Sequence, residues 1–531
     1  MVTKPILCAL LATCLVDAFS PSTKTEPLPA IATHLFAATS TTSRLKRATP
    51  LEDWAKQAEI KLGEGVSINQ SSFGGLGLLV SKEVPGNSLL LTVPSDIALS
   101  IESPGIGPNE RAVLDLVEDR RALREAPWYV QFSLYLHHLD KVSSKRSSGV
   151  DFRNWLDALP RSFDTPINWS EADKKELQYN HIVESVSRQD TEWNKLYKMI
   201  QEVASSSLQG FTYDNFVWGC ECARSRAFSG AYTGSAFNPL VYAFTLLLVG
   251  VYIGLGFGTL DEAANGAGLV FAATVFKDFV LPKLFSKKRY VICPVIDMAN
   301  HNSVKKTSEV AFEFFGDSYS LATSFAVPPG GEVLISYGDR SNDQLLQYYG
   351  FVEADNPNDV YIMPPLREWD IDKLEKACGR NIAPGRLNKL ERAGLLGKST
   401  LDGDASNDDY DTIANPKGGV VVTRSSGIDP AVIQALRALF STEEEWDIAG
   451  AAIGNFAEEM SSDNERIARL VAKTALELEL DSKPTTLEED LKLIELIESS
   501  KSMDASPEEE LAIRFRVEKK KLLLDTMKAL D

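Results

Sequence analysis

The chain has few of the residues from which metal sites and disulfide scaffolds are built. Its 531 residues include six cysteines and five histidines, and neither set falls into a recognised zinc-ligand spacing. Two of the cysteines, Cys8 and Cys14, lie in an N-terminal apolar stretch of the kind that is removed after targeting. We therefore expect no metal site and no disulfide scaffold.

Several catalytic loops are also absent. There is no Walker-type phosphate loop, and the glycine-rich runs at 74–77 and 254–258 lack the spacing of a dinucleotide fingerprint. No Gly-x-Ser-x-Gly elbow occurs, so a serine hydrolase has no support. These absences disfavour a Rossmann nucleotide site and a serine hydrolase.

Positive charge is in short supply. The chain has 55 lysines and arginines against 74 acidic residues, a formal net charge of −19, and nucleic-acid backbone binding needs a basic face. We therefore expect no nucleic-acid partner. A composition of 44% hydrophobic and 24% charged residues is that of a globular protein, and the length suggests two or three domains.

The N-terminus has the pattern of two consecutive targeting segments. Lys4 precedes an apolar run that ends at Val16, which predicts a signal peptide over 1–18. Residues 19–48 are rich in Ser and Thr, carry four basic residues and have one acid, which predicts a plastid transit peptide. The order, with Phe19 after the cleavage point, resembles the bipartite presequences of algae with complex plastids. A secreted protein with a disordered N-terminus is the alternative.

From Leu51 onward the pattern predicts a packed, mixed α+β chain. Two strands joined by a Pro-Gly turn are expected at 75–80 and 89–94, and helix-spaced apolar residues follow from about 110 to 208. Strand patterns return at 291–295, 311–315, 320–326 and 332–337. The last third is helical in pattern, at 430–440, 467–480, 487–497 and 508–530.

Four segments, taken together in their order, carry a family resemblance. The third segment is the most telling. They are Gly75-Leu76-Gly77-Leu78 followed by Pro85-Gly86; Trp218 with Ser225-Arg226-Ala227-Phe228; Pro294 to Asn302; and Gly331-Glu332 followed by Ser336-Tyr337-Gly338 and Tyr349-Gly350-Phe351. The set resembles the SET-domain methyltransferases, in the branch related to the plastid Rubisco large-subunit methyltransferase (LSMT).

The resemblance implies an architecture. It consists of a SET domain over 51–365, with small β-sheets, a knot-like crossing and a helical insert at about 100–215, followed by an all-α substrate-binding domain over 366–531. An acidic C-terminal part, with 34 acids and 23 bases from Leu366 to Asp531, favours a basic or neutral target surface.

The resemblance also implies a reaction, the transfer of a methyl group from S-adenosyl-L-methionine to a protein lysine. In the family's pattern, Tyr337 and Tyr349 are the catalytic tyrosines. The cofactor-binding residues by the same resemblance are Gly75, Leu76, Gly77, Arg226, Asn300 and His301. One position departs from the pattern: relatives have an acidic residue directly before the glycine-rich loop, where this chain has Gly74. Asp297 is expected to be structural.

An insertion at about 229–289 is not part of the family pattern. No charged residue occurs from Ala227 to Leu260, and the apolar stretch Pro239–Gly258 is long enough to cross a bilayer. Because Arg226 and Asn300 must meet at one cofactor, a membrane insertion would have to be a two-pass or re-entrant hairpin through Pro239 to Phe276. A soluble apolar hairpin packed on the catalytic domain is the alternative.

The sequence therefore predicts a plastid protein-lysine methyltransferase acting on the Rubisco large subunit or another stromal protein. Two alternatives stay open, a protein-histidine methyltransferase and a catalytically silent SET scaffold in a plastid assembly. The oligomeric state is not determined by the sequence.

Overall fold

The protein is described by a computed structural model. It describes residues 50–103, 113, 116–141, 150–231, 288–313, 317–396, 417–450, 452–499 and 505–531. Both predicted targeting segments, and most of the apolar insertion including Pro239 to Phe276, lie outside these residues.

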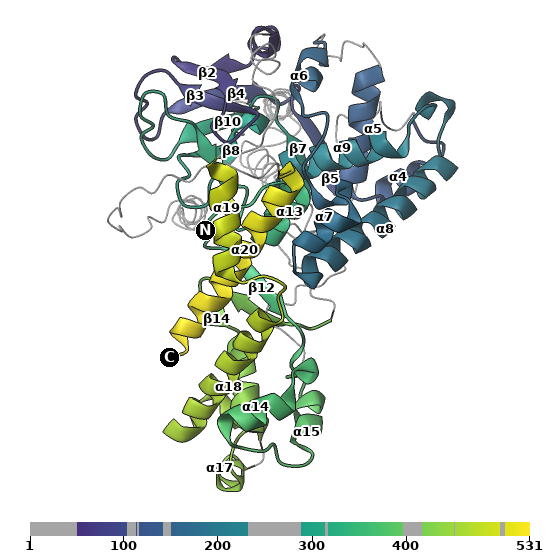
Figure 1. Ribbon diagram of the computed structural model, residues 1–531. Coiled ribbons are helices and arrows are strands. Elements are labelled where there is room, and N and C mark those ends of the chain that lie inside the picture. Colours follow the sequence, from purple (N-terminus) through teal and green to yellow (C-terminus); the bar gives the residue numbers. More distant parts are fainter. Residues whose placement is uncertain are drawn as a thin grey trace, which may run out of the picture. The chain divides into compact units, whose positions relative to one another are not determined.

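The largest sheet of the N-terminal half has four strands in the order β1-β4-β10-β9, of which Figure 1 labels β4 and β10. All neighbours are antiparallel, and β4 is central, with Leu91 opposite Leu62 on one side and Leu321 on the other. Leu90, Leu91 and Val93 of β4 are buried, as expected for a central strand with apolar side chains. The strands are β1 (Lys61–Leu62), β4 (Leu89–Pro94), β9 (Ser308–Glu313) and β10 (Ser318–Thr323).

The two strands predicted around the Pro-Gly turn are present but do not pair with each other. β3 (Leu76–Val80) pairs with β2 (Val66–Gln70), whereas β4 pairs with β1 and β10. The connecting segment makes its own bridge from Val84 to Val327, and its left-handed residue is Asn87. A short turn between two strands makes a hairpin only when the two strands pair with each other. Here β3 pairs with β2 instead, and β4 pairs with β1 and β10.

Two small sheets bring the motif segments together. β5 (Leu99–Ser103), β7 (Lys288–Ile292) and β6 (Phe228–Ala231) form one, in the order β5-β7-β6. β8 (Asn300–His301) and β11 (Leu334–Ile335) form a parallel pair, in which Asn300 lies opposite Leu334. The predicted strand at 332–337 is thus only two residues long, and that at 291–295 ends at Ile292.

Helices fill the segment between β5 and β6. They are α4 (Arg120–Glu125), α5 (Trp128–Lys141), α6 (Arg153–Ala158), α7 (Glu171–Glu176), α8 (Asn180–Glu202) and α9 (Tyr213–Arg226), with 3-10 turns at Pro166–Asn168 and Ser206–Leu208. α5 and α9 approach closely at Gly219, where the absence of a side chain makes room for Ser133. A Cβ at this position would collide with Ser133. Trp128 stacks on Tyr290 with ring centroids 4.3 Å apart, which fixes α5 against β7.

The C-terminal part is mainly helical. It follows α13 (Asn342–Tyr349), and its own helices are α14 (Ile371–Cys378), α15 (Arg386–Arg392), α16 (Pro430–Leu439), α17 (Glu443–Ile448), α18 (Ser462–Asp481), α19 (Leu487–Glu498) and α20 (Pro507–Ala529). It also contains a three-stranded sheet of β12 (Val360–Met363), β13 (Val420–Thr423) and β14 (Gly427–Ile428). The C-terminal domain is therefore not purely helical, because the Val420–Val422 run pairs with β12.

The described residues form two hydrophobic cores. The first contains the sheets of the N-terminal half and most of the helical insert. The second contains the C-terminal helices, but also Trp169, Leu177 and Tyr179 of the insert and Leu346 of α13. The C-terminal helices thus pack on part of the insert. No helix among the described residues combines the length and hydropathy that crossing a membrane would require.

Candidate active site

Arg226 is the last residue of α9 and is paired with Asp297. Its Nη1 donates to the Asp297 carboxylate at 3.1 Å and to the Asp297 carbonyl oxygen at 3.0 Å. Trp155 Nε1 lies 3.3 Å from the same carboxylate, whose side chain is fully buried. Burial raises the pKa of Asp297, and the Arg226 charge opposes that rise. Asp297 therefore holds the guanidinium in place.

The guanidinium keeps unused hydrogen-bonding capacity. The Nε of Arg226 is buried and has no hydrogen-bond partner among the described residues. A buried donor without a partner is costly, and a planar guanidinium can bind a carboxylate through two donors at once. The Arg226 side chain is therefore suited to an anionic group entering the space beside it.

Tyr337 follows β11 and is anchored at three points. Its hydroxyl donates to the Ala299 carbonyl at 2.9 Å, its backbone N–H donates to His301 Nδ1 at 3.0 Å, and its carbonyl accepts from Arg340 Nε at 3.1 Å. Burial raises the pKa of Tyr337 well above its ordinary value. The hydroxyl is therefore neutral at physiological pH and has lone pairs left to accept further contacts.

Aromatic rings surround Tyr337. The Tyr349 ring is nearly parallel to the Tyr337 ring at 4.9 Å, and the His301 ring is stacked at 5.0 Å. Phe351 makes edge contacts with both tyrosines, at 6.5 and 6.2 Å. The chain can return from α13 to Phe351 because Gly350 has φ +72° and lies against the Asp164 backbone. The cluster forms an apolar wall beside the Tyr337 hydroxyl.

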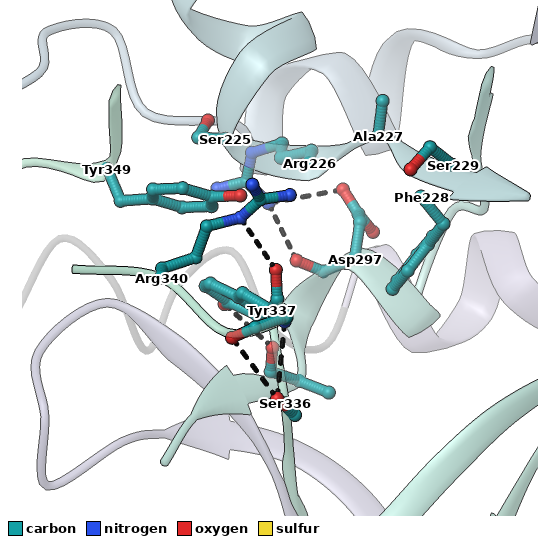
Figure 2. Close-up of a pocket in the computed structure, with 12 residues that line it drawn as sticks. Ser225, Arg226, Ala227, Phe228, Ser229, Asp297, Ser336, Tyr337, Arg340 and Tyr349 are labelled. Atoms are coloured by element: carbon teal, nitrogen blue, oxygen red, sulfur yellow. Dashed lines mark hydrogen bonds and ion pairs between the residues drawn. The ribbon is translucent and has the colours of Figure 1, made fainter. Parts of the chain in front are cut away.

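Arg226, Tyr337 and Tyr349 line one hollow of about 280 Å³. Figure 2 shows Arg226 directed toward Asp297 and Arg340 directed toward the Tyr337 backbone, with the Tyr349 ring beside the two guanidinium groups. The full lining is Ser225, Arg226, Ala227, Phe228, Ser229, Asp297, Ala299, Ser336, Tyr337, Gly338, Arg340 and Tyr349. The sequence-predicted residues from two distant motifs thus meet in one place.

The other predicted residues do not line this hollow. Gly75 has φ +71° and nothing near its missing Cβ, so the backbone there is open to approach. Leu76 and Gly77 are the first two residues of β3. This agrees with the strand predicted at 75–80, whereas the family resemblance implies that they belong to a loop. Asn300 connects to this strand, since its Nδ2 lies 3.4 Å from the Leu76 carbonyl. His301, the neighbour of Asn300 in β8, contacts Tyr337 and so connects the Asn300 strand to the residues that line the hollow.

Glu332 binds the glycine-rich segment to Asn300. Its carboxylate accepts from Ser71 Oγ at 2.9 Å and from Asn300 Nδ2 at 2.6 Å. Burial raises its pKa, and these hydrogen bonds act in the opposite direction. A Cβ at Gly77 would collide with this carboxylate. An acidic group thus stands beside the glycine-rich segment although residue 74 is glycine.

The similarities of the chain to known proteins agree with this geometry. The family model described as Rubisco LSMT substrate-binding matches residues 381–523. The chloroplastic fructose-bisphosphate aldolase-lysine N-methyltransferase of Arabidopsis thaliana is 22% identical over 88% of this chain and 80% of its own length. The actin-histidine N-methyltransferase of Danio rerio is 21% identical over 88% of this chain and 66% of its own length. A crystal structure of the SET domain of LSMT bound to lysine and AdoHcy matches with a TM-score of 0.54 and 18% identity, over 93% of this chain and 92% of that one.

The chain is thus similar over most of its length to proteins of the Rubisco LSMT type, and residues 381–523 match the substrate-binding domain of that family. The α+β SET fold expected from the motif segments is thereby confirmed.

In this SET-domain chain a second hollow, of about 410 Å³, adjoins the first. The two share Phe228, Ser229 and Ser336. The rest of the second hollow is lined mainly by β9, from Ser308 to Phe312, and by Arg289 and Lys306. The site around Tyr337 is therefore open to two adjacent spaces.

Four polar residues of this SET-domain site were not identified as functional from sequence. Asp297 and Glu332 lie inside the motif segments, but nothing in the pattern shows that one pairs with Arg226 and the other with Asn300. Arg340 and Glu353 follow the motif residues Tyr337 and Phe351 closely. A polar residue flanking a motif is the only available signal, and it is weak.

Proposed function

We propose that this chain is an S-adenosyl-L-methionine-dependent protein-lysine N-methyltransferase. The observation that carries the proposal is the hollow in which a partly buried guanidinium, whose buried Nε has no partner among the described residues, stands beside a neutral tyrosine hydroxyl and an aromatic wall. The chain's relatives include a lysine N-methyltransferase, and the LSMT SET domain was solved with lysine and AdoHcy. Both support the same reaction.

In this proposal Arg226 binds the carboxylate of the methionine part, a task that suits its geometry. The glycine-rich segment with Gly75, Leu76 and Gly77 and the pair Asn300 and His301 hold the remainder of the molecule. S-adenosyl-L-methionine supplies an electrophilic methyl group on its sulfonium. The residues of this chain then have to align the two reactants and exclude water, which can account for several kcal/mol of barrier lowering.

Tyr337 and Tyr349 are the proposed catalytic residues. The Tyr337 proton is donated to the Ala299 carbonyl, so its oxygen presents lone pairs to the reacting centre and can orient the incoming amine. The walls formed by Tyr349 and Phe351 disfavour a charged ammonium by desolvation, which lowers the pKa of a bound lysine toward its reactive neutral form. The second hollow, along β9, is the proposed approach for the protein substrate.

Lysine is favoured over histidine as the target. Phe228 lines both hollows, and an apolar wall suits the aliphatic stem of lysine, whereas an imidazole needs a polar partner for its second nitrogen. Asp297, the carboxylate in the hollow, is already paired with Arg226. The histidine alternative has the support of the actin-histidine relative. Amino-acid analysis of the methylated product decides between them.

We further propose a plastid location and a two-domain organisation. The Arabidopsis relative is named as chloroplastic, and the targeting pattern over 1–48 favours a complex plastid. The domains proposed are a SET domain over 51–365 and a substrate-binding domain over 366–531. Membrane contact through Pro239 to Phe276 stays a hypothesis. Washing plastid membranes at alkaline pH tests it, because a protein that leaves with the soluble fraction has no inserted hairpin.

The decisive experiment is transfer of labelled methyl from S-adenosyl-L-methionine into plastid extract proteins, with the full chain beside its Tyr337→Phe variant. Label entering a discrete band with the unmutated protein alone would support the proposal and would show whether the substrate is the Rubisco large subunit or another stromal protein. Absence of both label and calorimetric cofactor binding would instead favour the silent scaffold.

A further inference from the structure

The histidine that anchors Tyr337 has a defined proton position. The backbone N–H of Tyr337 donates to His301 Nδ1 at 3.0 Å. A nitrogen that accepts a hydrogen bond carries no proton, so in the neutral ring the proton must be on Nε2. The anchor of Tyr337 therefore depends on which tautomer His301 adopts.

Ser303 and Glu353 stand on the Nε2 side of the ring. Ser303 Oγ is 3.1 Å from Nε2, and the nearer carboxylate oxygen of Glu353 is 3.4 Å away. Ser303 donates to Glu353 through both its backbone N–H, at 2.8 Å, and its hydroxyl, at 2.6 Å. Because the only Ser303 hydroxyl proton points to Glu353, the atoms facing Nε2 are all acceptors. Only a proton on Nε2 satisfies them.

Glu353 is itself held rigidly and is charged. Burial alone would raise its pKa, but hydrogen bonds from His301 and Ser303 lower it. Its backbone N–H donates to Asn342 Oδ1 at 2.9 Å, and its carbonyl accepts from Asn342 Nδ2 at 3.0 Å. Asn342 is in turn held by Asp359, which accepts from its N–H and its Nδ2 at 2.9 and 3.1 Å. Both Asn342 and Asp359 are fully buried.

The same chain of contacts reaches the C-terminal domain. Asp359 accepts from Lys519 Nζ at 2.8 Å, and Lys519 is a buried residue of α20. A series of hydrogen bonds thus runs from the C-terminal helix through Asp359 and Asn342 to Glu353, whose carboxylate lies beside the ring beneath Tyr337.

We propose that Glu353 is a positioning residue of this active site, which holds His301 in its Nε2–H tautomer so that Nδ1 can fix the Tyr337 backbone. The inference rests on the proposed role of Tyr337 in methyl transfer. His301 thereby gains a side-chain task in addition to the cofactor-binding role that the family resemblance implies for it.

Glu353→Gln tests the proposal, because the carboxamide places N–H donors where the carboxylate offers only acceptors. The variant should favour the Nδ1–H tautomer, which cannot accept from Tyr337. We expect kcat to fall by about tenfold or more, with the KM for the protein substrate, the calorimetric cofactor affinity and the melting temperature nearly unchanged. The matched control is Glu445→Gln. Glu445 is a similarly covered carboxylate that accepts from Ser461 Oγ and the Thr442 N–H, away from this site.

A second variant distinguishes a positioning role of Glu353 from a general disturbance of the active-site structure. In His301→Asn the carboxamide oxygen can accept from Tyr337 N–H whatever residue 353 presents. Glu353→Gln should therefore have almost no further effect on kcat in the His301→Asn background, and this non-additivity is the mark of a shared pathway. If the two losses multiply, Glu353 does not act through His301 and the proposal is overturned.

A direct readout does not need activity. With ¹⁵N-labelled histidine the full chain has five imidazoles, and two-bond ¹⁵N–¹H spectra report their tautomers, with His301→Asn assigning the signal. The wild type should show Nε2–H at His301 and Glu353→Gln should show Nδ1–H. A wild-type Nδ1–H ring would refute the inference. If the tautomer changes as expected but the chain transfers no methyl group, the proposed function is refuted. The control of the His301 tautomer by Glu353 would still stand.

Discussion

The carboxylate of Glu332 lies where a side chain at residue 77 would have to go, so Gly77 and Glu332 form one structural unit. Glu332 also accepts from Ser71 Oγ and Asn300 Nδ2, and thus joins the glycine-rich segment to the Asn300 strand. The family resemblance implies that this glycine belongs to the cofactor-binding segment. In the structure its first neighbour is a glutamate of this chain, and the departure at Gly74 is accompanied by a carboxylate from another segment.

Gly77→Ala should therefore damage the cofactor site. The added methyl group would push the Glu332 carboxylate away from Asn300, and we expect overpacking to cost about 1–3 kcal/mol of folding free energy. Calorimetric S-adenosyl-L-methionine affinity should fall by about tenfold or more, which corresponds to at least ~1.4 kcal/mol. The control is Gly454→Ala, because nothing lies near that missing Cβ. Unchanged affinity in Gly77→Ala would contradict the role of this unit.

Arg226 and Asp297 form an ion pair, and substitutions can test the contribution of each residue separately. Arg226→Met would leave the fully buried Asp297 carboxylate unpaired, a loss of about 3–5 kcal/mol in comparable cases. Arg226→Lys retains the charge but loses the planar fork, so we expect a folded protein with cofactor affinity weakened by about tenfold or more. Denaturant unfolding and calorimetry measure the two effects.

Asp297→Asn provides the check on this pair. Combined with Arg226→Met it removes the unpaired charge, so it should restore most of the stability and none of the cofactor affinity. If the double variant is as unstable as Arg226→Met, the loss comes from packing and not from the buried charge.

The motif segments predicted the main features of the site but not its connections. Arg226, Tyr337 and Tyr349 could be found from sequence because each lies within a segment whose order carries the family resemblance, and the structure brings them to one hollow. Strand pairing could not be found, because β3 pairs with the strand before it, β2, while β4 pairs with β10, far along the chain. The role proposed for Glu353 could not be found from sequence either, because it depends on which nitrogen of His301 carries the proton.

The charges of α20 illustrate a second limit. Arg516, Glu518, Lys519 and Lys520 follow one another in a pattern typical of a solvated helix, yet all four are buried. Their partners, among them Asp490, Asp343 and Arg424, are dispersed over the chain, and no local periodicity indicates them.

Lys519→Met should be strongly destabilising. Burial alone would lower the pKa of Lys519, but Asp343 and Asp359 raise it, so the charged form is the stable one. Removing the cation leaves two buried carboxylates without the charge that they share, and we expect a loss of about 3–5 kcal/mol in guanidinium unfolding. Lys473→Met, at the more exposed pair with Asp531, is the control and should leave the midpoint unchanged. Equal effects of the two substitutions would refute the importance of burial here.

Glu221 predicts how stability changes with pH. It is buried in α9, accepts from Thr165 Oγ1 and from Asn168 Nδ2 at 2.7 Å, and burial raises its pKa to about 7. A carboxyl whose pKa is raised on folding stabilises the protein fully below its unfolded pKa, and that contribution is lost as the pH rises through the folded pKa. The loss should therefore develop between about pH 5 and pH 8.

Glu221→Gln isolates this term, because glutamine resembles the protonated acid and all other titrating groups are common to both proteins. The two proteins should have similar free energies of unfolding near pH 5, and the variant should be the more stable one near pH 8, by on the order of 2–3 kcal/mol. Denaturant titrations across this range measure the difference. A difference that stays constant with pH would mean that Glu221 is already ionised in the folded protein at pH 5, and that Thr165 and Asn168 outweigh its burial.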